Sequence, residues 1–78
     1  FRQVSLCRTL GGNDCPVITA TGLMPAEAEL RSRPALVVTA RVHPGESNGS
    51  YVAQGFLRFI TSDHPAAREL RERFVMKV

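Results

Sequence analysis

The sequence predicts an α/β fold, in which helices cover part of a mixed, largely parallel sheet. Residues 35–42 are apolar and rich in β-branched side chains, a pattern typical of a strand covered on both faces and therefore central in its sheet. A helix pattern follows, and residues 74–78 return to a strand pattern. A strand, a helical connection and a second strand form a crossover whose two strands run parallel. Because residues 74–78 resemble the start of a strand with no partner after it, we expect an incomplete sheet, belonging to a fragment.

The composition is that of one small globular unit. The chain has 78 residues, of which 44% are hydrophobic and 22% are charged. Its net charge of +3 is mild, and the basic residues are spread along the chain instead of forming the concentrated patch of a nucleic-acid-binding module. No apolar run approaches the ~20 residues that cross a bilayer. We therefore expect neither a nucleic-acid partner nor a membrane partner.

The first part of the chain predicts a β-hairpin over residues 3–21. Polar and apolar residues alternate on the N-terminal side, a glycine-containing turn follows at residues 11–14, and a β-rich run comes after it. Cys7 and Cys15 lie in the two strand patterns. Disulfide pairing would suit a secreted protein, but the chain otherwise resembles a cytosolic one, so we expect reduced, partly buried thiols. Residues 22–34 are expected to form a loop, with room for one helical turn.

Two helices are predicted after residue 46. Over residues 47–61, apolar side chains recur at three- and four-residue spacing, and Ser47 and Asn48 are good candidates for the N-cap. A second helix is expected over residues 65–73, because Pro65 is favoured at a first helical position and His64 precedes it as a capping residue.

A candidate metal turn lies between the predicted central strand and the first of these helices, at residues 43–46. His43 and Glu46 are three residues apart, and zinc accepts imidazole nitrogen and carboxylate oxygen as ligands. Pro44 and Gly45 suit a sharp bend that aims both side chains at one point. The same spacing also fits a helix-capping glutamate beside a surface histidine, and both interpretations stay open on the residues alone.

The sequence around this turn resembles a known family. Residues 41–48, Arg-Val-His-Pro-Gly-Glu-Ser-Asn, are similar to the zinc motif of the cytosolic carboxypeptidases, a branch of the zinc metallocarboxypeptidases. Residues 6–16 and 74–78 resemble the segments that flank this motif in the family. The resemblance implies that residues 1–78 are the N-terminal portion of a catalytic domain with a zinc carboxypeptidase-like (phosphorylase/hydrolase-like) fold.

The resemblance also implies a ligand set. His43 and Glu46 would be two of three protein ligands of one zinc ion. The third ligand, the arginine that grips the substrate and the glutamate that moves the proton come further downstream in the family, so no catalytic residue is assigned in this fragment. His64 is expected to cap a helix and not to bind zinc. Gly45 stands where the pancreatic enzymes carry an arginine, and the cytosolic branch shares this glycine.

The implied activity is that of a cytosolic, zinc-dependent hydrolase. It would remove C-terminal residues from a protein substrate with an acidic tail, such as the glutamates of tubulin, with zinc activating water and polarising the scissile carbonyl. The fragment alone is expected to be inactive. Two alternatives remain: an aspartoacylase-like zinc deacylase, which also uses a His-x-x-Glu turn, and a non-catalytic remnant that serves as a folding or interaction piece.

Overall fold

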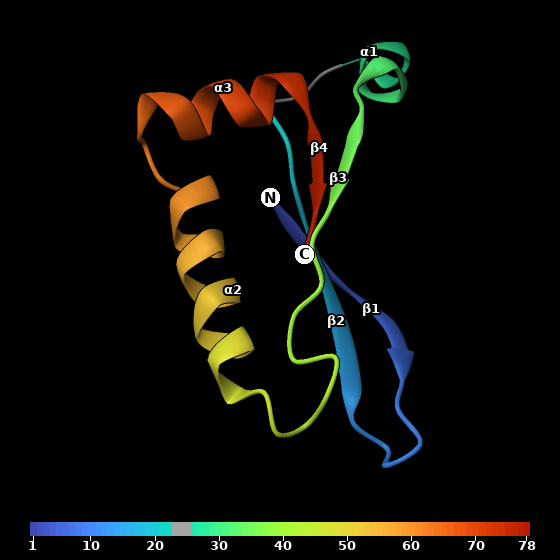
Figure 1. Ribbon diagram of the computed structural model, residues 1–78. Coiled ribbons are helices and arrows are strands. Elements are labelled where there is room, and N and C mark those ends of the chain that lie inside the picture. The colour runs from blue at the N-terminus through green and yellow to red at the C-terminus, as the bar shows by residue number, and fades with distance from the viewer. Residues whose placement is uncertain (23–25) are drawn as a thin grey trace.

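The computed structural model describes residues 1–22 and 26–78. Its four strands form one sheet in the order β1-β2-β4-β3. Figure 1 shows α2 lying beside the sheet and α3 running across the end of it from which β3 and β4 start. The elements in chain order are β1 (Arg2–Arg8), β2 (Asp14–Ala20), α1 (Glu27–Ser32), β3 (Ala35–Val37), α2 (Ser47–Ile60), α3 (Pro65–Arg73) and β4 (Val75–Lys77).

The sheet is mixed, as expected, but it is only partly parallel. β1 pairs with β2 and β2 pairs with β4 in antiparallel fashion, while β3 and β4 are parallel. The prediction of a largely parallel sheet is therefore wrong for the described residues. The short hairpin turn forces β1 and β2 to be antiparallel, whereas the long connection through α2 and α3 lets β3 and β4 run parallel.

The predicted central strand at residues 35–42 is shorter than expected and lies at an edge. Only Ala35–Val37 is strand, and Val37 is 66% exposed. The Val38 amide still donates to the Lys77 carbonyl oxygen at 2.8 Å. The covered, two-faced strand is thus a wrong prediction for this part of the protein.

A short helix occupies part of the segment expected to be a loop. α1 covers Glu27–Ser32, and the expectation at residues 23–25 lies outside the described residues. Two ion pairs at four-residue spacing accompany it: Arg31 to Glu27 at 2.5 Å and Arg33 to Glu29 at 2.9 Å. Such pairs contribute only about 0.2–0.5 kcal/mol each, so α1 depends on its surroundings as well.

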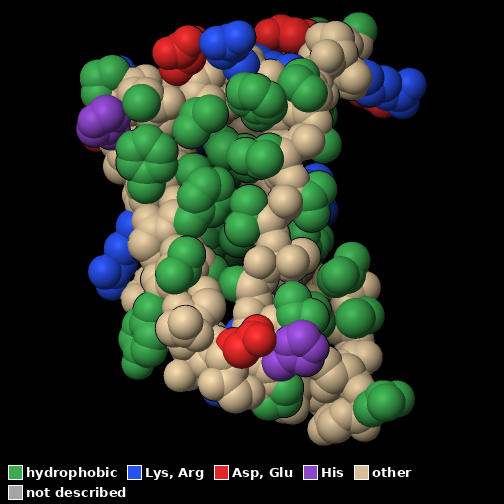
Figure 2. All heavy atoms as spheres, viewed as in Figure 1, with side chains coloured by type: hydrophobic (Ala, Val, Ile, Leu, Met, Phe, Trp, Pro, Cys, Tyr) green, Lys and Arg blue, Asp and Glu red, His purple; other side chains and the backbone are tan. Residues whose placement is uncertain are grey.

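The core is small and lies toward the α3 end of the sheet. Ala20 of β2, Ile60 of α2 and Met76 of β4 are fully buried and form one cluster. Many other hydrophobic side chains stay exposed. Figure 2 shows hydrophobic side chains gathered in a band between α2 and the strands. Neither α2 nor any other described helix combines the length and hydropathy of a membrane span.

Candidate metal centre

The turn at residues 43–46 lies between β3 and α2, and backbone hydrogen bonds hold it in place. The Glu46 amide donates to the His43 carbonyl oxygen at 3.1 Å, and the Gly49 amide donates to the Glu46 carbonyl oxygen at 2.9 Å. The first bond closes a tight turn around Pro44 and Gly45, and the second starts the helix. His43 therefore stands before the turn and Glu46 at its end.

The two predicted ligands meet in space. His43 Nδ1 lies 3.2 Å from Glu46 Oε1, and the side chains are 75% and 57% exposed, respectively. Glu46 is the N-cap residue of α2, but its side chain makes no capping hydrogen bond. The prediction that Ser47 or Asn48 caps α2 is wrong, because Ser47 is already the first helical residue. The Glu46 carboxylate is turned toward the imidazole instead.

The separation of these two atoms fits a shared metal ion. Ligands that bind one tetrahedral zinc at about 2.0–2.2 Å lie roughly 3.3–3.6 Å from each other. The observed 3.2 Å is close to this range, so a small side-chain adjustment would suffice. The donor set, one imidazole nitrogen and one carboxylate oxygen, is also the one that zinc accepts. Without an ion, the same two atoms satisfy each other through a hydrogen bond or an ion pair.

Arg41 supports the turn from the side of β3. Its φ is +62°, a left-handed conformation that costs a residue with a Cβ about 1–2 kcal/mol. Its Nε donates to the Pro44 carbonyl oxygen at 3.1 Å, which ties the start of the segment to the middle of the turn. An added Cβ at Gly49 would come within 3.0 Å of the Arg41 backbone nitrogen. The absence of a side chain at Gly49 thus lets α2 approach Arg41.

Arg41 and Gly49 were not singled out for this role from the sequence. No local pattern predicts a left-handed arginine, because the conformation follows from the path that the chain takes between β3 and α2. Gly49 offered a weak signal, since a glycine in a first helical turn often marks a close approach. Its neighbour could be identified only from the fold.

The remaining candidate ligands lie elsewhere. His64 is the N-cap of α3, and its Nδ1 accepts a hydrogen bond from the Ala66 amide at 3.1 Å, which confirms the predicted capping role. Cys7 and Cys15 are free thiols on the hairpin. Cys15 is half-buried, as expected, but Cys7 is exposed, because among the described residues β1 is an edge strand paired with β2 alone. Within residues 1–22 and 26–78, no three His, Cys, Asp or Glu side chains converge on one point.

The chain is similar to curated proteins over its whole length. It is 51% identical to "Cytosolic carboxypeptidase 4" of Homo sapiens, with 100% of this chain and 8% of that protein covered. It is 55% identical to "Cytosolic carboxypeptidase 2" of Danio rerio over 94% of this chain and 10% of that protein. For "Cytosolic carboxypeptidase 1" of Gallus gallus the identity is 43%, over 100% of this chain and 7% of the relative.

These relatives are much longer proteins, and the chain spans a tenth of their length or less. No family model and no solved structure matches the chain. No solved structure therefore supports the expected zinc carboxypeptidase-like fold, whereas the sequence similarity extends over all the elements described above. Over its whole length, the chain is therefore similar to one segment of the cytosolic carboxypeptidases.

Proposed function

We propose that residues 1–78 form the N-terminal portion of the catalytic domain of a zinc-dependent carboxypeptidase, and that His43 and Glu46 are two protein ligands of its zinc ion. The observation that carries the proposal is the 3.2 Å separation of His43 Nδ1 and Glu46 Oε1 on an exposed turn. The names of the relatives support the reaction class, since each is called a carboxypeptidase.

The exposure of the two side chains supports the proposal further. A catalytic zinc site has three protein ligands and keeps one position open for water or substrate. His43 and Glu46 are accessible enough for both a third ligand and a substrate to reach an ion held between them. Within residues 1–22 and 26–78, no third His, Cys, Asp or Glu side chain joins this pair, so the third ligand of the proposed site has to come from another part of the protein.

The chemistry divides between the ion and the protein. Zinc supplies Lewis acidity, which lowers the pKa of a bound water and polarises the scissile carbonyl. His43 and Glu46 would hold the ion in the connection between β3 and α2, and the hydrogen bond from Arg41 to Pro44 keeps the turn between them in place. The proton-transferring group and the group that grips the substrate belong to other parts of the protein.

The substrate we propose is the carboxyl terminus of a cytosolic protein with an acidic tail, such as tubulin. The word "cytosolic" in the names of the relatives supports the compartment. Those names also favour peptide cleavage over the deacylation carried out by aspartoacylase-like enzymes. A non-catalytic remnant would instead have lost the third ligand, the proton-transferring glutamate or both.

Turnover by the intact protein tests this proposal. We expect the intact protein to hydrolyse peptides that end in several glutamates. We expect His43→Ala to reduce turnover below detection, because only two protein ligands would then remain for zinc, one fewer than a catalytic site has. The matched control is His64→Ala, which removes a histidine that caps α3. Unchanged hydrolysis by His43→Ala would refute the metal assignment, and inactivity of the unaltered protein on all such peptides would refute the substrate class.

A further inference from the structure

The two cysteines of the chain face each other across the hairpin. In the register of β1 and β2, Cys7 is the partner of Cys15, and Arg8 is the partner of Asp14. Side chains of directly opposed residues in an antiparallel pair point to the same face, with Cβ atoms about 4.5–5.5 Å apart. The thiols of Cys7 and Cys15 are therefore neighbours on one face of the hairpin.

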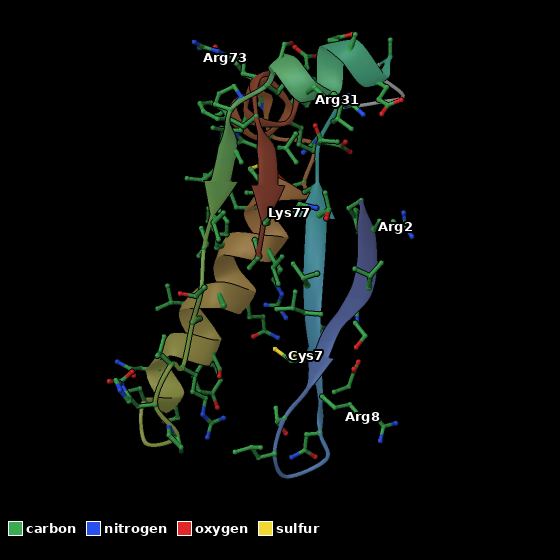
Figure 3. The ribbon with its side chains drawn as sticks, turned by 90° about the vertical axis from the view of Figure 1, so that its right-hand side faces the viewer. Arg2, Cys7, Arg8, Arg31, Arg73 and Lys77 are labelled. Carbon is green, nitrogen blue, oxygen red and sulfur yellow. The ribbon has the colours of Figure 1, made fainter. Side chains whose placement is uncertain are left out.

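An irregularity in β1 is what brings them together. Ser5 is paired with Pro16, so a regular ladder would place Leu6 opposite Cys15 and would turn Cys7 to the other face. The register shifts between Ser5 and Cys7, as in a β-bulge, which inserts one extra residue and realigns those that follow. Figure 3 shows Cys7 and the next residue, Arg8, directed to opposite sides of β1.

The spacing suits a disulfide. The Thr9 amide donates to the Asn13 carbonyl oxygen at 2.8 Å, so this pair is of the hydrogen-bonded kind. Cys7 and Cys15 lie two residues away from Thr9 and Asn13 along their strands, so they also form a hydrogen-bonded pair. In such a pair the Cα atoms are about 5.5 Å apart. Disulfides span Cα separations of about 4.4–6.8 Å, but they need Cβ atoms about 3.5–4.5 Å apart. Closing the bond therefore requires the two Cβ atoms to approach slightly, and such strain makes a disulfide easier to reduce.

Accessibility suits the chemistry as well. Cys7 is exposed, so a small oxidant reaches it directly, and Cys15 is half-buried beside it. An accessible cysteine next to a second cysteine that resolves the oxidised form is the usual arrangement of a redox-sensing pair. We propose that Cys7 and Cys15 form a reversible disulfide on exposure to hydrogen peroxide. The proposal does not rest on the metal site.

The reaction balances with peroxide as the only oxidant. The Cys7 thiolate attacks one peroxide oxygen, the O–O bond breaks, and Cys7 becomes a sulfenic acid while hydroxide leaves and is protonated to water. The Cys15 thiol then attacks the Cys7 sulfur, the S–O bond breaks, and the proton from Cys15 leaves with the hydroxyl group as a second water. Two thiols are oxidised to one disulfide and one peroxide is reduced to two waters. A dithiol reverses the step by exchange.

Peptide mapping of the intact protein tests the proposal. The reduced protein is treated with hydrogen peroxide, its remaining thiols are alkylated with iodoacetamide, and it is digested with trypsin under non-reducing conditions. Because trypsin cleaves after Arg2, Arg8 and Arg31, Cys7 lies in peptide 3–8 and Cys15 in peptide 9–31. We expect these two peptides to be recovered joined, and to separate when dithiothreitol is added. Recovery of both peptides as alkylated thiols, or as separate sulfinic acids, would overturn the proposal.

A matched variant separates pairing across the strands from mere closeness in sequence. In the double variant Ser5→Cys/Cys7→Ser, the moved thiol stays in peptide 3–8 but faces away from Cys15, because Ser5 shares the face of Pro16 and its Oγ donates to Asp14. We expect this variant to form the joined peptides at least tenfold more slowly than the unaltered protein when both are folded. The two should cross-link at similar rates in guanidinium chloride. Equal rates in the folded state would contradict the proposal.

Discussion

Replacing Gly49 by alanine should destabilise the metal turn, although alanine is the better helix former. Gly49 and Gly55 both lie within α2, which makes Gly55 a matched control. In a helix interior, glycine is less favourable than alanine by about 0.8–1.0 kcal/mol. An added Cβ at Gly55 meets no atom of the described residues within 4 Å. Gly55→Ala should therefore stabilise the protein by about 0.5–1 kcal/mol.

At Gly49 the same methyl group meets the backbone of Arg41. The added Cβ would lie 3.0 Å from the Arg41 nitrogen and 3.5 Å from its Cα, so Arg41 has to retreat by a few tenths of an ångström. Arg41 is already held at φ +62°, a conformation that costs about 1–2 kcal/mol, and it is tied to Pro44. We expect the contact to outweigh the gain in helix propensity, which leaves Gly49→Ala about 1–2 kcal/mol less stable than Gly55→Ala.

Two measurements on the intact protein check this expectation. Urea unfolding compares the free energies of the two variants, and competition with a zinc chelator compares their zinc affinities. Since 1.4 kcal/mol is a tenfold change in an equilibrium constant, zinc binding weakens by up to about tenfold, the full amount applying when the zinc-free turn shifts to relieve all of the strain. The reasoning is refuted if Gly49→Ala stabilises the protein as much as Gly55→Ala and binds zinc as tightly as the unaltered protein.

Three further predictions concern the stability of the unit, each read from the change in unfolding free energy of the intact protein. Ile60→Ala should cost about 2–5 kcal/mol, because Ile60 is fully buried. Its control, Leu10→Ala, changes a fully exposed residue and should alter the stability by no more than about 0.5 kcal/mol. Equal effects of the two variants would place the core elsewhere. Arg71→Gln should cost about 1–3 kcal/mol, because Arg71 Nη1 donates to the carbonyl oxygens of Ile60 at 2.6 Å and Ser62 at 2.9 Å; a cost near zero would mean that water replaces the guanidinium. His64→Ala should cost about 1 kcal/mol through loss of the cap of α3, and no cost would show that this hydrogen bond does not contribute.

Helices were the part of the fold that local sequence predicted best. α2 extends over Ser47–Ile60 and α3 over Pro65–Arg73, within a residue of the expected ranges. Their signals are local: apolar spacing along one face, proline at a first helical position and His64 before it. α1 gave only a hint, because it is short and no residue in it is buried.

The sheet and the surroundings of the metal turn were harder to predict, because both depend on distant residues. Whether the apolar run after Pro34 forms a covered strand depends on which other strands and helices pack against it, and the pattern of the run itself does not identify them. The His43–Glu46 pair could be predicted, since its spacing is local. The left-handed Arg41 and the register that places Cys7 opposite Cys15 could not, because each follows from how two segments meet.

The zinc content of the intact protein tests the central claim most directly. After dialysis against metal-free buffer, we expect one zinc per chain in the unaltered protein and in His64→Ala. We expect a loss of at least nine-tenths of that zinc in both His43→Ala and Glu46→Gln, since the first variant removes the imidazole and the second replaces the anionic carboxylate by a neutral amide. Retention of a full equivalent of zinc by His43→Ala or Glu46→Gln would contradict the assignment of this turn as the metal centre.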